Sequence, residues 1–201
     1  MPRPRTRIQQ KNSETILEAA LEVFSAQGFR GATLDQIAEV AGLSKPNLLY
    51  YFSSKEAIHQ ALLADLLDTW LDPLRAMNPV GEPVAEVMAY MRRKLEMSRD
   101  FPRESRLFAN EVLQGGHRLR EAIEGELKAL VEEKAVVLRR WMDEGRIARL
   151  DPVHLLFSIW ALTQHYADFD MQVRAVLGEG HDPYAEAGDF LETLYTRLLR
   201  P

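Results

Sequence analysis

Three consecutive residues, Lys45, Pro46 and Asn47, carry the clearest chemistry in this 201-residue chain. Lysine can donate to the edge of guanine, asparagine can bond two groups of adenine, and proline can contact a thymine methyl group. They directly follow Ser44, a residue type that caps the first turn of helices. A short helix that begins with these side chains can enter the major groove of DNA N-terminus first.

Side chains around this short helix can hold the phosphates that flank the bases. Hydroxyl groups and helix N-termini donate to phosphate oxygens, and an ammonium adds positive charge. The candidates for these contacts are Thr33, Ser44, Tyr50, Tyr51 and Lys55. The alternative from the residues alone is a plain three-helix bundle with solvated lysines and tyrosines that only pack.

A second set of residues suits a small planar molecule. Trp160, Gln164 and Asp168 follow an i, i+4, i+8 spacing, which places them in one stripe on a helix. Buried polar groups need partners, and a bound molecule can supply them. The amide of Gln164 matches the alternating N–H and C=O edge of a pyrimidine base. The other candidate ligand contacts are Trp70, Lys94, Ser98, Phe108, Glu111 and His165.

Each of these side chains also has an ordinary interpretation. Trp70 and Trp160 can be core residues, and Lys94 can be a solvated surface lysine. Gln164 and Asp168 can pair with arginines or lie in a hydrated dimer interface.

The sequence favours a binding protein over an enzyme. Glu111, His165 and Asp168 could serve as acid–base groups, but the chain has no nucleophile elbow or phosphate loop. His154 and His165 are roughly 16 Å apart along a helix, too far to share a metal ion. We expect no catalytic residues, no metal and no cofactor beyond the small-molecule effector.

The elements that position these residues are predicted to be helices throughout, so the fold class is all-α. Thr33 with Gln36, and Ser53 with Glu56, have the spacing of capping boxes. Gly28 and Gly42 are predicted to end helices, and Gly42 to require a positive φ. The predicted helices end at Gly28, span 34–41, 45–51 and 54–74, and then span 83–100, 102–114, 118–145, 152–176 and 183–200.

This pattern predicts two domains. Residues 1–53 form a three-helix helix-turn-helix domain with a basic N-terminal arm, and residues 54–201 form a larger helical domain for effector binding and dimerisation. Residues 1–60 hold seven basic and six acidic side chains, whereas residues 61–201 hold 18 and 24. The arm residues Arg3, Arg5, Arg7 and Lys11 precede the first acidic residue, which suits a polyanionic partner.

Composition excludes several classes of protein. The hydrophobic fraction of 46% and charged fraction of 27% are ordinary for a globular chain. No apolar run approaches the roughly 20 residues that span a bilayer, so we expect no membrane partner. The chain has no cysteine, which fits a cytoplasmic location.

The last two predicted helices carry wide apolar faces. Such faces on terminal helices suggest a homodimer built from two helices of each chain, although they can also be buried within one chain. A dimer would read two halves of a pseudo-palindrome. The residues of the two faces are Leu155, Ile159, Leu162, Tyr166 and Phe169 on one helix, and Phe190, Leu191, Leu194, Tyr195 and Leu198 on the other.

The helix-turn-helix region resembles TetR-type transcriptional regulators. The resemblance rests on the runs at 16–24, 28–33, 37–38, 41–44 and 50–52 and on Lys55-Glu56. It implies that Lys45, Pro46 and Asn47 contact bases. Most members carry tyrosine at the position of Leu49, and a leucine there cannot form a hydrogen bond.

The resemblance extends to the RutR-type branch of that family, the pyrimidine-utilisation regulators. It is carried by the runs at 47–52, 70–74, 94–100, 105–108 and 163–169. It implies a homodimeric regulator that binds double-stranded DNA and responds to uracil or thymine. The leading hypothesis is that the effector gates a repressor, and the sequence leaves the sign of regulation open. The alternative is a TetR-type regulator that responds to another nucleobase or to an apolar compound.

Overall fold

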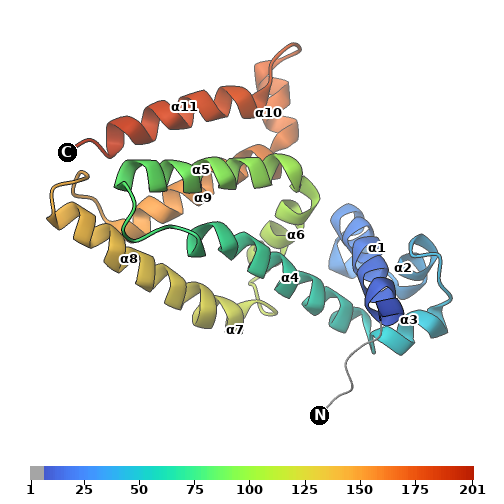
Figure 1. The fold of residues 1–201 in the computed structure, drawn as a ribbon. Helices are drawn as coiled ribbons and strands as arrows, with labels where there is room; N and C mark the ends of the chain where they lie inside the picture. The colour runs from blue at the N-terminus through green and yellow to red at the C-terminus, as the bar shows by residue number, and fades with distance from the viewer. Residues whose placement is uncertain (1–6) are drawn as a thin grey trace. The chain divides into compact units, whose positions relative to one another are not determined.

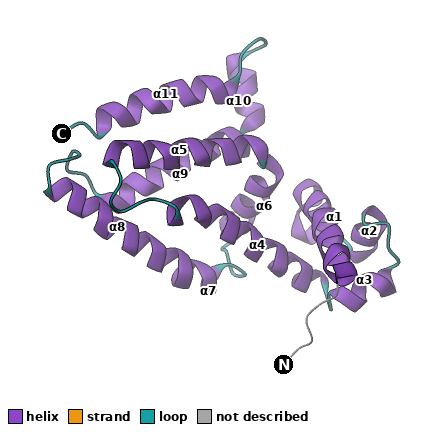
Figure 2. Ribbon diagram, in the orientation of Figure 1, coloured by secondary structure: helices purple, strands orange, loops and turns teal. Residues whose placement is uncertain are grey.

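The computed structural model describes residues 7–201, and every regular element in this range is a helix (Figures 1 and 2). The expected all-α class is confirmed. The elements are α1 (Arg7–Gly31), α2 (Leu34–Val40), α3 (Lys45–Tyr51), α4 (Lys55–Arg75), α5 (Pro83–Asp100), α6 (Pro102–Leu113), α7 (Arg120–Ala122), the π-helix η1 (Ile123–Leu127), α8 (Lys128–Asp143), α9 (Pro152–Asp168), α10 (Asp170–Leu177) and α11 (Pro183–Leu198). The arm residues Arg3 and Arg5 lie outside the described residues.

The chain divides into two compact units. The first contains Met1–Leu67 together with Arg106–Leu119, and the second contains Asp68–Ser105 together with Arg120–Pro201. This division differs from the boundary expected after residue 53, because the first half of α4 and most of α6 belong to the first unit. Helices α4 and α6 therefore each contribute residues to both units.

In the first unit, α1, α2 and α3 pack against one another around a small apolar core. Ile16, Phe24, Ile37 and Leu48 are buried there. The predicted capping box is present, since Thr33 Oγ1 accepts from the Gln36 N–H and the Gln36 side chain accepts from the Thr33 N–H. These local contacts set the start of α2.

The turn between α2 and α3 depends on one glycine. Gly42 has a φ of +66°, as the sequence predicted, and residues other than glycine are strained in that conformation. Gly28, with a φ of +69°, breaks the helical conformation near the end of α1, also as predicted.

In the second unit, α9 packs against α5 and α8, and α11 packs against α5 (Figure 1). Leu155, Ile159, Leu191 and Tyr195 are buried within the single chain. The prediction that they form a dimer face is therefore wrong for these four residues. Phe169 and Phe190, by contrast, are more than half exposed.

Three local predictions were also wrong. Ser54 rather than Ser53 caps α4, because Ser54 Oγ accepts from the Ala57 N–H at 3.1 Å. The helix expected over 118–145 begins at Arg120 and contains the π-helix η1. The helix expected over 152–176 is interrupted at Phe169, whose φ of −116° and ψ of 29° are not helical.

No helix within residues 7–201 is both long enough and apolar enough to cross a membrane.

Candidate functional site

Helix α3 presents its N-terminal side chains to solvent. Lys45, Pro46 and Asn47 are exposed, and Pro46 occupies the first turn, where a missing N–H leaves no carbonyl without its partner. Lys45 Nζ forms an ion pair with Asp35 Oδ2 of α2 at 2.9 Å, and both side chains are largely exposed. An exposed pair of this kind is weak, so a guanine edge can compete for the ammonium.

Two of the predicted phosphate-binding hydroxyls serve as helix caps. Ser44 Oγ accepts from the Asn47 N–H at 3.4 Å, and Thr33 caps α2 as described above. Both residues are exposed and flank α2 and α3. Their contacts with phosphate remain predictions.

The two tyrosines at the end of α3 are joined to α1. Gln9 Nε2 donates to Tyr50 Oη at 3.1 Å, and Asn12 Nδ2 donates to Tyr51 Oη at 2.7 Å. The two tyrosine rings meet edge to face, with their centroids 5.1 Å apart. The sequence predicted the two tyrosines as site residues but not the side-chain amides of Gln9 and Asn12 that bond to them.

Lys55 has an internal role that the sequence did not reveal. Its Nζ donates to the carbonyl oxygens of Phe29 and Ala32, both at 2.8 Å, and lies 4.5 Å from the centroid of the Phe29 ring. These contacts hold the end of α1 against the start of α4. An ammonium has three N–H donors, so a phosphate contact would use the third.

In the second unit, the structure brings together several of the predicted ligand residues. Lys94 Nζ lies 5.3 Å from the centroid of the Trp70 ring and interacts electrostatically with Asp168. Asp168 Oδ1 accepts from Ser105 Oγ at 2.6 Å. Ser98 is buried beside Lys94 on α5, and its hydroxyl donates to the Lys94 carbonyl.

Lys94 is unusual because its side chain is only 3% exposed. Within residues 7–201, its ammonium donates no hydrogen bond. Burial lowers the pKa of Lys94 from 10.5 to about 7, and the charge of Asp168 opposes that shift. The ammonium is thus close to losing its proton at neutral pH.

Lys134 provides a contrast in the same unit. It is also buried, at 4% exposure, but its Nζ donates to the carbonyls of Arg75 and Met77 and pairs with Glu133. One buried lysine therefore has acceptors for its N–H groups, and the other has none among the described residues.

Trp160 and Gln164 lie on α9. Trp160 Nε1 donates to Tyr90 Oη at 2.5 Å, so its indole N–H is already occupied. Gln164 is half-buried, and its amide forms no hydrogen bond within the part of the chain that the structure describes.

Phe108 and Glu111 belong to the first unit rather than to the second-unit cluster around Lys94. Glu111 is 5% exposed and accepts from the backbone N–H and the guanidinium of Arg118 at 3.2 and 3.0 Å. The Arg118 guanidinium lies 4.0 Å from the centroid of the Phe29 ring. Glu111 thus already has a cationic partner.

The same region buries His59, a residue that sequence reasoning missed. Its ring contacts those of Phe24 and Phe29, each at 4.8 Å between centroids, and its Nδ1 has no partner within residues 7–201. Burial lowers the pKa of His59 from 6.5 to about 4. Glu111 acts against this shift, and Arg118 and Lys55 add to it.

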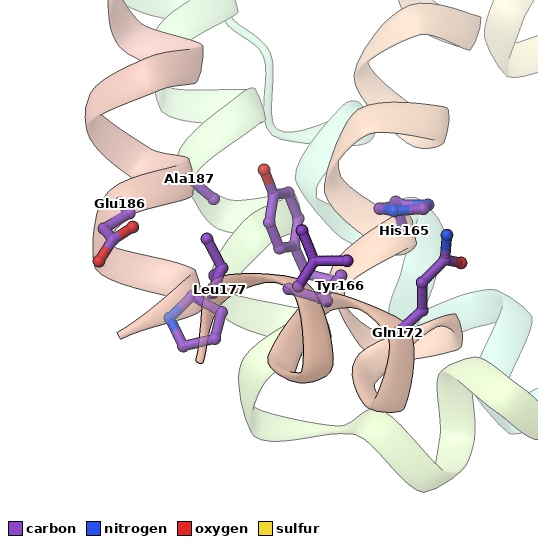
Figure 3. Close-up of a pocket in the computed structure, with 9 residues that line it drawn as sticks. His165, Tyr166, Gln172, Leu177, Glu186 and Ala187 are labelled. Atoms are coloured by element: carbon purple, nitrogen blue, oxygen red, sulfur yellow. The ribbon is translucent and has the colours of Figure 1, made fainter. Parts of the chain in front are cut away.

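His165 is exposed and lines a separate groove of about 390 Å³ between α9, α10 and α11. Figure 3 shows His165 and Gln172 on one side of this groove and Glu186 on the other. None of the other predicted ligand residues lines it. His165 follows Gln164 directly and therefore points about 100° away from it around the helix.

Two family models match almost the whole chain. Residues 16–62 match the model described as bacterial regulatory proteins, tetR family. Residues 63–201 match the model described as YcdC-like protein, C-terminal region. The chain belongs to the TetR family.

Individual relatives agree with this assignment. The chain is 51% identical over 174 residues to the HTH-type transcriptional regulator RutR of Escherichia coli strain K12, covering 87% of this chain and 82% of the relative. Among solved structures that share the fold, a transcriptional regulator from Streptomyces coelicolor aligns with a TM-score of 0.75 at 24% identity, covering 94% of this chain and 98% of that chain. AibR in complex with isovaleryl coenzyme A and operator DNA aligns with a TM-score of 0.73 at 19% identity, covering 94% and 99%.

Membership of the TetR family settles the broad class of function. The protein is a transcriptional regulator with a helix-turn-helix, and its relatives are regulators rather than enzymes. Members of this family bind DNA operators and small-molecule effectors, typically as dimers.

Proposed function

We propose that this TetR-family protein is a homodimeric repressor controlled by a pyrimidine base, uracil or thymine. Each protomer places the first turn of α3 in the major groove of one half of a pseudo-palindromic operator. The base binds the second unit beside Lys94 and weakens the binding of DNA. Helices α4 and α6, which contribute to both units, couple the two events with a free energy of about 1–3 kcal/mol.

The observation that carries this proposal is the buried ammonium of Lys94. A buried charge without hydrogen bonds is costly, and a ligand carbonyl would supply the missing acceptor. The wall of the site beside the ammonium is an indole ring, Trp70, which suits a flat ligand. Gln164 offers both a donor and an acceptor and has no partner in the described chain.

The likeness to E. coli RutR supports a pyrimidine over other effectors. It covers most of both chains and includes the segments around Trp70, Lys94 and Gln164 that carried the resemblance in the sequence. A pyrimidine ring carries carbonyl oxygens for Lys94 and an adjacent N–H for the Gln164 side chain.

Dimerisation is supported by the exposed apolar side chains of the C-terminal region. Phe169, Met171, Val176 and Phe190 are each more than half exposed. They belong to α10, α11 and the break before α10, and Val176 lines the same groove as His165. A second copy of the chain would cover such a surface.

The effector proposal is tested by the melting temperature of the purified protein with uracil, thymine, cytosine, adenine and an apolar cation. A base at about 100 times its dissociation constant should stabilise the protein by roughly 2.7 kcal/mol. We expect a shift with uracil or thymine, which Gln164→Ala should abolish. A shift with adenine or the apolar cation alone would replace the pyrimidine with that class of effector.

The DNA proposal is tested by selecting duplexes from a random pool with the purified protein. We expect a consensus with two inverted half-sites about one helical turn apart. Lys45→Ala should relax the preference at one base pair of each half-site. A consensus with a single half-site would contradict the dimeric mode of reading.

A further inference from the structure

We propose that Gln9 and Asn12 of α1 are positioning residues for DNA binding, which orient the hydroxyls of Tyr50 and Tyr51 toward the phosphate backbone. This inference rests on the proposed binding of operator DNA by α3. It adds a second element, α1, to the interface and assigns a direction to each tyrosine hydroxyl.

The direction follows from which atom donates. In both contacts the amide N–H is the donor and the phenolic oxygen is the acceptor. A tyrosine hydroxyl has one hydrogen of its own, which remains available after the oxygen has accepted a bond. Within residues 7–201, neither Tyr50 nor Tyr51 donates that hydrogen to another group.

A phosphate is the chemical class that fits two such donors. Phosphate oxygens only accept hydrogen bonds, and hydroxyl groups are common partners of the DNA backbone. A hydroxyl that accepts a bond is polarised and becomes a better donor. Tyr50 is 69% exposed, and Tyr51 directly follows it at the end of the helix that carries Lys45.

The arrangement on α1 is consistent with this role. Gln9 and Asn12 are three residues apart, so they lie on one face of the helix and reach adjacent tyrosines. Arg7 and Lys11 are exposed on the same stretch of α1 and contribute positive charge near a polyanion. The edge-to-face contact between the tyrosine rings further restricts their orientation.

The test measures the affinity for the selected duplex at several salt concentrations. The variants are Tyr51→Phe, Asn12→Leu and the double variant, with Gln10→Leu as the matched control. Gln10 is an exposed amide on α1 with no hydrogen-bond partner among the described residues. Melting temperatures of all variants show whether the first unit remains folded at the assay temperature.

Tyr51→Phe should weaken binding about tenfold, as expected for a hydrogen bond to a charged group. Asn12→Leu should weaken it about threefold alone and less than twofold in the Tyr51→Phe background, because the two residues act through one bond. The salt dependence should keep its slope in both variants, since a neutral hydroxyl releases no counterion. Gln10→Leu should bind as the wild type does.

A second readout separates positioning from simple packing. Each phosphate of the duplex is replaced in turn by a methylphosphonate. The wild type should show an extra loss of affinity at one position in each half-site, and Tyr51→Phe should not. The inference is overturned if Tyr51→Phe shows the same extra loss of affinity at the same phosphate as the wild type. It is also overturned if Asn12→Leu weakens binding equally in the wild-type and Tyr51→Phe backgrounds. A wild-type protein that selects no duplex would instead contradict the proposed function itself.

Discussion

The two units bury charge in different ways. In the first unit, buried Glu111 has Arg118 as its partner, and burial keeps His59 neutral at physiological pH. In the second unit, Lys94 is buried without a hydrogen-bond acceptor in the described chain, although Lys134 of the same unit has several. The buried carboxylate of the first unit thus already has a cationic partner, whereas the second unit contains a buried cation for which a ligand can supply the acceptor.

The largest effect should come from replacing Lys94, the buried cation that has no hydrogen-bond acceptor in the described chain. Lys94→Met removes a buried cation with little change in shape, so the free energy of unfolding without effector should rise by about 1–4 kcal/mol. The same change should weaken uracil or thymine binding about a hundredfold, the upper range for a charged hydrogen bond. Urea unfolding and calorimetric titration measure the two quantities.

Lys134→Met is the matched control for this comparison. It should destabilise the protein, because it leaves the Arg75 and Met77 carbonyls without their donor, and it should leave effector affinity unchanged. The gain in free energy of unfolding of Lys94→Met over the wild type should also shrink as the pH rises from about 7 toward 10.5, since the folded wild type then loses its buried charge. Loss of stability in both variants would show that Lys94 is already satisfied.

Breaking the ion pair between Glu111 and Arg118 should lower the free energy of unfolding, the opposite of the effect of Lys94→Met. Glu111→Gln keeps the shape of the side chain but removes its charge and one acceptor for Arg118. We expect a loss of about 2–3 kcal/mol in the free energy of unfolding, measured with urea at pH 7. If this variant binds the effector as tightly as the wild type does, Glu111 is not a ligand contact.

The buried histidine predicts a pH dependence of the first unit. The pKa of His59 is about 4 in the folded protein and 6.5 in the unfolded chain. Below pH 6.5 the unfolded chain binds a proton that the folded chain does not, so stability falls until the pH reaches about 4. Between pH 7 and 5 the free energy of unfolding should fall by about 2 kcal/mol. Urea unfolding of the wild type should show this fall, and His59→Phe should not. A wild-type urea midpoint that does not change over this pH range would contradict the prediction.

The smallest effect concerns the local caps. Thr33→Ala removes the oxygen that accepts from the Gln36 N–H and should cost about 1 kcal/mol of stability. Operator affinity should fall at the same time, because α2 supports α3. Thr15→Ala, at an exposed threonine of α1 whose hydroxyl bonds only to its own helix, is the control.

The success of sequence reasoning follows the same division between the units. The helix-turn-helix could be predicted because its signals are local: a capping box at Thr33, a positive φ at Gly42 and a cap at Ser44. The error at the start of α4 was a shift of one residue between two serines, and either serine could serve as the cap.

The second unit was harder to predict because its determinants lie far apart in the chain. The sequence allowed Lys94 to be either a ligand contact or a solvated surface lysine, and its burial beside Trp70 and Asp168 depends on residues distant in the chain. The apolar faces of 152–176 and 183–200 were real, but a single chain buries much of them. The break at Phe169 has no glycine or proline to signal it. The partners of Tyr50 and Tyr51 are about 40 residues away on α1, beyond any local pattern.

The position of Lys94 over Trp70 also gives the protein a built-in spectroscopic reporter. The chain has three tryptophans, and Trp70, Trp141 and Trp160 all belong to the second unit. Indole emission therefore reports on the second unit alone, without a contribution from the helix-turn-helix. Because a charge close to an indole ring shifts its emission, protonation of Lys94 and arrival of a ligand should each be visible in unlabelled protein.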